Sequence, residues 1–164
     1  MKDKDIIEAL GSRFRKDELV FDERSDMLTI TVPKGIIHDV MRFLKEEGSM
    51  QFGFLTDLTG IHYPDRELAL GVIYHLHNFL NNHRIRVKTF TSVDDPYVKT
   101  VTDLFSGANW MERETYDFYG IKFEGHPNLK RILNVEYLDY FPMRKEYPLE
   151  DPTREDKDDR FFGR

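Results

Sequence analysis

The stretch of the chain that decides the fold is LALGVIYHLHNFLNNHRIRVK, residues 68–88. Its first part, 68–76, is rich in β-branched and aromatic residues, and its last part, 84–88, alternates basic with apolar side chains. Both compositions are typical of β-strands, and Asn81-Asn82 between them predicts a turn. Because strands joined by a short turn are antiparallel neighbours, this stretch predicts the centre of an antiparallel sheet.

Three more strands are predicted before this stretch. One lies around residues 52–54 and is followed by the sequence Tyr-Pro-Asp-Arg at 63–66, which predicts a turn. Two short strands are predicted at 18–22 and 27–32, with Ser25-Asp26 as the turn between them.

Two helices are predicted in the same N-terminal part of the chain. Apolar residues recur at helical spacing over 6–14 and 36–44. Gly48 is placed to end the second helix in a left-handed cap. Helices combined with an antiparallel sheet predict an α+β fold in which the helices pack on one face of the sheet.

Two short helices are predicted after the sheet. Thr100 and Asn109 each precede an acidic residue by three positions, which is the spacing of a helix N-cap. Ser106-Gly107 separates the two, and Gly120 is expected to end the second helix. The predicted α+β domain therefore covers residues 1–120.

Residues 121–164 differ in character from the rest. They contain prolines at 127, 142, 148 and 152 and no sustained hydrophobic period, and positions 150–160 are nearly all charged or polar. This composition predicts an extended, largely irregular C-terminal arm. The arm also carries aromatic residues that need another surface to cover them, so we expect it to dock on a partner protein. They are Phe123, Tyr137, Tyr140, Phe141, Tyr147, Phe161 and Phe162.

The overall composition narrows the classes of function. With 30 acidic and 24 basic residues the formal charge is −6, which disfavours binding to nucleic-acid backbones. The absence of cysteine excludes disulfides, thiolate-bound zinc and an all-cysteine iron–sulfur cluster in this chain. The sequence has no apolar stretch of membrane-spanning length and no apolar segment at its start. We therefore expect a cytoplasmic chain, unless a partner holds it elsewhere.

Ionisable residues cluster at 112–117, and His126 follows closely. On a helix, Arg113 and Asp117 are four positions apart and are expected to pair, while Glu114 and Asp117 share a face on which a metal or acid–base site is conceivable. Capping and surface pairing explain the same cluster without any chemistry, and we prefer that interpretation.

Two other groups also have simple interpretations. The four histidines 62, 75, 77 and 83 fall in or near predicted strands, but they lack the spacing of a known metal motif. Arg84, Arg86 and Lys88 form a basic stripe, which strand alternation places in solvent.

A longer motif is far more specific. Residues 107–133, GANWMERETYDFYGIKFEGHPNLKRIL, closely resemble the signature of the C subunit family of NADH-quinone oxidoreductase, the 30 kDa-type subunit of respiratory complex I. Further matches are YHL at 74–76, VTDLF at 101–105 and FPMRKEYP at 141–148, so the resemblance extends from about Leu55 onward. The chain departs from the family pattern at His62, where members usually carry an acid, and at Tyr140, where they carry glycine.

The resemblance implies a structural subunit that has no catalytic centre of its own. It implies an α/β domain with a long arm embracing the neighbouring 49 kDa-type subunit. Neither a flavin, an iron–sulfur cluster nor a nicotinamide is expected in this chain, since FMN and the clusters belong to other subunits. The chain is then peripheral, held on the cytoplasmic side of the bacterial inner membrane through the complex that transfers electrons from NADH to quinone and translocates protons.

The signature residues are expected to lock the junction between helix and arm and to dock the arm. Matched by position, they are Glu112, Arg113, Glu114, Asp117, Tyr119, Gly120, His126, Pro127, Arg131, Pro142, Arg144 and Lys145. Among them, Arg113, Arg131 and Arg144 offer planar guanidinium groups that suit buried carboxylates on a neighbour.

Two alternatives remain open at this point. The first is the equivalent subunit of a membrane-bound hydrogenase or formate hydrogenlyase-type complex. The second is a free-standing metal-dependent hydrolase that uses Glu112, Glu114, Asp117 and His126.

Overall fold

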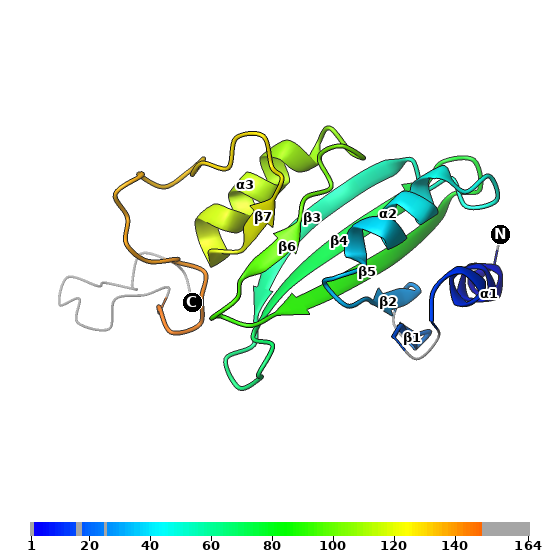
Figure 1. The fold of residues 1–164 in the computed structure, drawn as a ribbon, viewed down its shortest axis with the longest axis horizontal. Helices are drawn as coiled ribbons and strands as arrows, with labels where there is room; N and C mark the ends of the chain where they lie inside the picture. The colour runs from blue at the N-terminus through cyan, green and yellow to red at the C-terminus, as the bar shows by residue number, and fades with distance from the viewer. Residues whose placement is uncertain (1, 16–17, 25, 149–164) are drawn as a thin grey trace, which may run out of the picture.

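The centre of the molecule is a five-stranded sheet. The computed structural model describes residues 2–15, 18–24 and 26–148. The strands are β1 (Val20–Asp22), β2 (Thr29–Thr31), β3 (Phe54–His62), β4 (Leu70–Asn78) and β5 (His83–Thr91). Their order across the sheet is β1-β2-β5-β4-β3 (Figure 1). The other predicted strands and the turns at 63–66 and 81–82 are therefore confirmed. The strand predicted around 52–54 is misplaced, since β3 begins only at Phe54 and runs on to His62. Ser25 of the remaining predicted turn lies outside the described residues.

One pair in this sheet was not predicted. The pairs β1–β2, β3–β4 and β4–β5 are antiparallel as expected, but β2 and β5 are parallel, with Ile30 opposite Val87. The two strands are separated in the chain by a helix and the β3–β4 hairpin, and a parallel pair needs a crossover of that kind. The α+β class is confirmed, but the sheet is mixed and not wholly antiparallel.

Three helices accompany the sheet, namely α1 (Asp3–Arg13), α2 (Ile37–Glu46) and α3 (Ala108–Tyr119). Figure 1 shows α2 lying over β4 and β5, with α3 beside β3. Their apolar sides share a single core with the inward face of the sheet, to which Leu58, Tyr74 and Val87 belong. The alternation over 84–88 is confirmed as well, because Ile85 and Val87 are fully buried while the basic residues that alternate with them are not. Arg84 is exposed, whereas Arg86 and Lys88 are only half-buried, so they are less open to solvent than predicted.

Two details of the helices differ from the sequence-based predictions. The helix predicted to begin at Thr100 is not formed. Residues 101–105 form a turn instead, closed by a hydrogen bond from the Phe105 amide to the Val101 carbonyl. The Thr100 side chain is hydrogen-bonded to Glu112, so it serves as a tertiary contact. The predicted cap at Gly48 is also wrong, because α2 ends in an extended residue, Glu47.

The end of the third helix is as predicted. Gly120 has a φ of 76° and ends α3 in the left-handed conformation. Directly after it, β7 (Lys122–Glu124) pairs in parallel with β6 (Tyr97–Lys99). The first residues of the predicted arm are therefore a strand that contacts the α+β body.

The segment 125–148 has no further helix or strand, in agreement with an irregular arm. It runs back alongside the C-terminal end of α3 (Figure 1), where the Met143 amide donates to the Phe118 carbonyl. The charged positions 150–160, with Phe161 and Phe162 beyond them, lie outside the described residues. Within the described part of the chain, no helix is both long enough and apolar enough to cross a membrane.

Candidate functional site

A buried carboxylate, that of Asp117 near the end of α3, organises the junction between helix and arm. The side chain is fully buried, and Oδ1 accepts hydrogen bonds from Arg131 Nη1 at 2.8 Å and Asn134 Nδ2 at 3.1 Å. Oδ2 accepts three backbone N–H groups in succession, from Ile132, Leu133 and Asn134, at 3.1, 2.8 and 2.9 Å. We call Asp117, Arg131 and residues 132–134 the Asp117 clasp.

The electrostatics of this clasp favour the ionised acid. Burial by itself raises the pKa of the Asp117 carboxyl, but the three backbone N–H groups and Arg131 stabilise the anion more strongly. The net result is a pKa well below the ordinary value for aspartate. The clasp is therefore fully charged at neutral pH.

Arg131 extends the clasp into the arm. Besides the carboxylate, Nη1 donates to the Asp117 carbonyl at 2.9 Å, and Nη2 donates to the Leu138 and Tyr140 carbonyls at 2.7 and 3.2 Å. The guanidinium carbon also lies 5.1 Å from the centre of the Phe141 ring. One nearly buried side chain thus connects α3 to the arm as far as residue 141.

The other two signature arginines also bind within this chain. Arg113 donates to the Lys130 and Arg131 carbonyls at 3.1 and 3.2 Å, and Arg144 Nε donates to the Tyr119 carbonyl at 2.8 Å. That these guanidinium groups also bind a neighbour's carboxylates stays a prediction. Their acceptors are backbone carbonyls and one carboxylate of the same chain, because the arm folds back onto its own helix. The predicted Arg113–Asp117 pair is not formed either.

Two glycines lie where an aromatic ring comes so close to the backbone that no side chain would fit. A Cβ on Gly120 would lie 2.5 Å from the Phe141 ring and 2.8 Å from Arg144 Nη2. On the sheet side, a Cβ on Gly60 of β3 would lie 2.3 Å from the ring of Tyr119. The Tyr119 side chain is partly buried in this contact, and the burial raises the pKa of its hydroxyl. Glycine at these positions lets α3 contact the arm on one side and the sheet on the other.

The remaining matched residues lie at the two ends of the junction. His126 Nε2 donates to the Asn109 carbonyl at 3.0 Å, and its Nδ1 accepts the Asn128 amide at the same distance, next to the exposed Pro127. At the far end, half-buried Pro142 precedes Lys145, whose amide donates to His62 Nδ1 at 3.0 Å.

The two signature glutamates on α3 lie apart from this junction. Glu112 is buried against Thr100 and Val101, and Glu114 is exposed. Together with His126, which is bonded to a backbone carbonyl, they do not form a common site with Asp117. Over the described ranges, no three histidine or acidic side chains are placed to hold a metal ion.

The predicted histidine cluster is also dispersed. His75 accepts from Arg86 and His77 is bonded to Asn82, while His83 contacts Asp3. His62, at the end of β3, accepts the amide of Lys145 in the arm. The four imidazoles therefore have separate structural partners.

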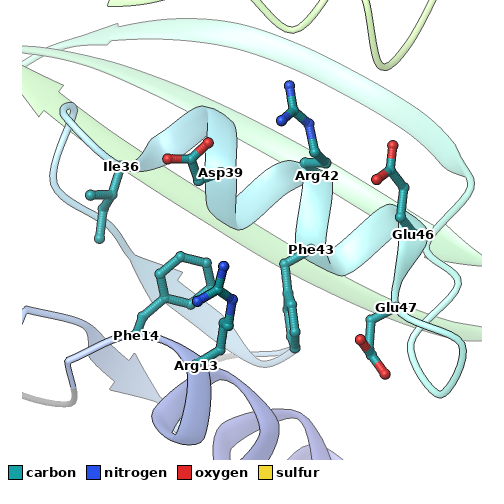
Figure 2. Close-up of a pocket in the computed structure, with 8 residues that line it drawn as sticks. All are labelled: Arg13, Phe14, Ile36, Asp39, Arg42, Phe43, Glu46 and Glu47. Carbon is teal, nitrogen blue, oxygen red and sulfur yellow. The ribbon is translucent and has the colours of Figure 1, made fainter.

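A surface pocket of about 570 Å³ lies away from the junction, between the end of α1 and α2. Figure 2 shows Phe14 and Phe43 facing each other in the space between these helices, while Arg42 and Glu46 point away from the aromatic pair. The two rings are edge-on with centroids 5.8 Å apart. The residues that line the pocket include charges of both signs and none of the signature residues. The pocket therefore suggests no particular ligand.

Sequence reasoning missed Asn134, Gly60 and the backbone amides of the clasp. The amides carry no side-chain signal, and Asn134 lies just beyond the resembling stretch 107–133. Both charged members of the clasp were singled out, but their separation of 14 positions in the chain hid their pairing.

Replacing Arg131 by Lys should lower the free energy of unfolding by about 2 kcal/mol, because one ammonium group cannot bridge the four acceptors that the guanidinium reaches. Urea denaturation of the purified chain measures this. Lys130→Arg, at the exposed neighbouring position, serves as the control and should change stability by less than about 0.5 kcal/mol. Equal midpoints for Arg131→Lys and the unmodified chain would contradict the role of the planar group.

Comparison with known proteins confirms the family resemblance of the signature. Residues 30–153 match the family model described as respiratory-chain NADH dehydrogenase, 30 Kd subunit. The NADH-quinone oxidoreductase C subunit of Caulobacter vibrioides is 43% identical over 122 residues, which are 74% of this chain and 61% of that protein. The corresponding C subunit of Chelativorans sp. is 42% identical over 144 residues, 88% of this chain and 70% of that protein.

A mitochondrial relative and two solved structures extend the comparison. The probable NADH-ubiquinone oxidoreductase 30.4 kDa subunit of Candida maltosa is 44% identical over 128 residues, 78% of this chain but only 46% of that protein. A trypsin-resistant fragment of Nqo5 has a TM-score of 0.66 at 31% identity and covers 79% of this chain and all of the fragment. A chain of the archaeal membrane-bound sulfane sulfur reductase has a TM-score of 0.75 at 25% identity, covering 91% of this chain and 87% of that one.

The chain thus spans between about half and two thirds of the length of several curated relatives. The match to the family model includes the signature, the clasp and most of the sheet. This chain belongs to the family of the 30 kDa subunit of the respiratory-chain NADH dehydrogenase.

Proposed function

We propose that this chain is a peripheral subunit of a proton-translocating NADH:quinone oxidoreductase and that its role there is structural. Family membership and the names of the bacterial relatives support this. Electron transfer depends on cofactors held in fixed geometry, so the chain contributes by holding its neighbours in place. No reaction is assigned to the chain's own side chains, and FMN and the iron–sulfur clusters are assigned to other subunits.

The observation that carries this proposal is the surface around the Asp117 clasp. The clasp fastens the arm to α3, and large apolar side chains nearby remain exposed. We call four of them, Trp110, Leu133, Val135 and Tyr137, the arm surface, and between 47 and 87% of each is exposed. Exposed apolar and aromatic side chains of this size are typical of protein interfaces.

The partner proposed for the arm surface is the 49 kDa-type subunit, within a set of other peripheral-arm subunits. Membrane association then occurs only through the complex, on the cytoplasmic side of a bacterial membrane. The buried ion pair of the clasp suits such a role, because in some proteins pairs of this kind fix one arrangement of neighbouring segments.

Replacing Leu133 and Tyr137 together by Ser should leave the isolated chain folded and weaken its incorporation into the complex at least about tenfold, since aromatic interface anchors each contribute more than about 1.4 kcal/mol. Co-purification of partner subunits with the tagged chain from native membranes measures this, together with NADH:quinone activity. The matched control is Val20→Ser with Leu68→Ser, two apolar residues exposed elsewhere. Normal assembly with the first pair would contradict the proposed interface.

A second candidate is the equivalent subunit of a related membrane complex without NADH oxidation, such as a membrane-bound hydrogenase. The similarity to a chain of the sulfane sulfur reductase favours keeping it. The same purification distinguishes the two candidates. A complex that oxidises NADH and contains a flavoprotein module supports the first, and a complex that lacks both supports the second.

A free-standing metal-dependent hydrolase is no longer proposed. Asp117 is saturated by clasp donors, Glu112 is buried against a loop, and Glu114 is exposed. These carboxylates therefore do not converge with His126 on one reactive centre.

A further inference from the structure

Glu112 is a buried acid that the junction does not use. Its side chain is completely buried between α3 and the turn 100–105. One carboxyl oxygen accepts the Val101 amide at 2.8 Å, and the other is hydrogen-bonded to the Thr100 hydroxyl. Neither partner is a cation, and within the described part of the chain no ion pair involves Glu112.

The charged and titratable groups around Glu112 also leave it without compensation. On the turn, Asp103 carries the same charge as an ionised Glu112. The neighbouring group on β4 is the neutral phenol of Tyr74, whose buried hydroxyl has no hydrogen-bond partner among the described residues.

The α2 side chains that reach this turn are engaged with other groups. His38 Nε2 lies 2.9 Å from Asp103 Oδ2, and Arg42 lies 3.8 Å from the same oxygen. Lys45 donates to the Leu104 carbonyl. An ionised carboxylate at position 112 would therefore be a buried charge without a counter-ion, which is a costly arrangement.

The hydrogen bonds around Thr100 are complete when the acid carries its proton. The Thr100 hydroxyl donates to an ionised Glu112, whereas a protonated Glu112 would donate to Thr100 Oγ1 in the reverse direction. Thr100 Oγ1 also accepts the Thr102 amide at 3.2 Å. The Thr100 hydroxyl proton is then available for Thr102 Oγ1, 3.0 Å away. Every group in this chain of bonds has a partner without any net charge in the core.

We propose that Glu112 is a neutral carboxylic acid in the folded chain, and that its proton joins α3 to the turn 100–105. Ionisation places an uncompensated charge in the core and loosens this joint. Burial, reinforced by Asp103, raises the pKa of Glu112 to about 7 against the opposing bonds from Thr100 and Val101. The joint therefore responds to pH in the physiological range, independently of the Asp117 clasp.

The sign of the stability effect follows from linkage. The pKa of Glu112 is higher in the folded chain than in the unfolded chain, so the folded state gains stability while the acid is protonated. That gain is complete below pH 4.5 and is lost as the pH rises to about 7. The rise from 4.5 to about 7 corresponds to a decrease of roughly 300-fold in the folding equilibrium constant.

The test uses the full-length chain in two measurements. The first is a carbon-13 NMR titration of glutamate-labelled protein, with the Glu112 carboxyl assigned by its absence in Glu112→Gln. The second compares unfolding free energies between pH 5 and 8.5 for the unmodified chain, Glu112→Gln and the control Glu114→Gln. The amide introduced by Glu112→Gln preserves neutral bonds to Thr100 and Val101, whereas Glu114 is exposed on the same helix.

We expect the Glu112 signal to titrate near neutral pH. Between pH 5 and 8.5 the same pKa change corresponds to a decrease of roughly 75-fold in the folding equilibrium constant, which the control should retain and Glu112→Gln should largely remove. A Glu112 signal that titrates below pH 5, or parallel stability curves for Glu112→Gln and the unmodified chain, would overturn the proposal. If Glu112→Gln does not fold, the Glu112 carboxyl signal can be assigned by its absence in Glu112→Asp. The titration of the unmodified chain then still decides the outcome.

Discussion

Asp117→Asn should destabilise the chain by about 4 kcal/mol, the magnitude typical of breaking a buried ion pair from one side. The substitution preserves the shape of the side chain but removes the charge that Arg131 and three backbone amides surround. Arg131 is then left buried beside a neutral amide. Chemical denaturation at pH 7 measures the loss, and Asp139→Asn, at an exposed position of the same arm, should change stability by less than about 0.5 kcal/mol.

The pH dependence of the same variant has a defined sign. The pKa of Asp117 is lower in the folded chain than in the unfolded chain, so the clasp contributes its full stability above the ordinary value of 3.8. That contribution decreases as the pH falls below 3.8 towards the lower folded-state pKa. The unmodified chain should lose stability over this acidic window more steeply than Asp117→Asn, and identical slopes would contradict the ionised clasp.

Gly120→Ala should also cost about 4 kcal/mol, from backbone strain at a positive φ together with overpacking against the arm. The added methyl group would meet the Phe141 ring and Arg144, so α3 and the arm must separate. Thermal or urea unfolding measures the effect. Gly107→Ala at the other end of α3 is the matched control, since its φ is −64° and, of the residues that the structure describes, none beyond its chain neighbours has an atom within 4 Å of the added carbon.

The control variant should be neutral or slightly stabilising, because alanine at a compatible position reduces the freedom of the unfolded chain. A Gly120→Ala variant as stable as Gly107→Ala would show that the arm does not press against the end of α3.

The local features of the fold were predictable from the sequence, and the non-local ones were not. Alternation at 84–88 and the helical spacing over 36–44 identified β5 and α2, because a buried face imposes its period directly on the residues. The parallel β2–β5 pair is fixed by tertiary packing between distant segments, for which neither strand carries a local signal. The same limit explains why β6 and β7, each three residues long, were missed.

The candidate site was predictable in its residues but not in its connections. Family resemblance singled out Asp117 and Arg131, and residue chemistry suggested that arginines would bind carboxylates. An arm without a regular period was expected to run beyond its own domain towards a partner. Its first part is instead fastened to α3 by backbone amides at 132–134, which no side-chain pattern indicates.

The clasp also gives the proposed structural role a physical basis. Its charged bonds hold the backbone that carries Leu133 and Val135, so the proposed arm surface exists before any partner binds. A preformed surface reduces the entropy that binding must overcome. Variants of the clasp should therefore weaken assembly even though their side chains are buried and do not contact the partner.

Hydrogen–deuterium exchange at the amides of residues 132, 133 and 134 in the isolated chain is the most direct test of the claim that the arm is fastened to its own helix. These three amides should be strongly protected in the unmodified chain at pH 7, and Asp117→Asn should remove that protection while amides in β4 stay protected. Exchange of the three amides at the rate of an unstructured peptide in the unmodified chain would contradict the claim.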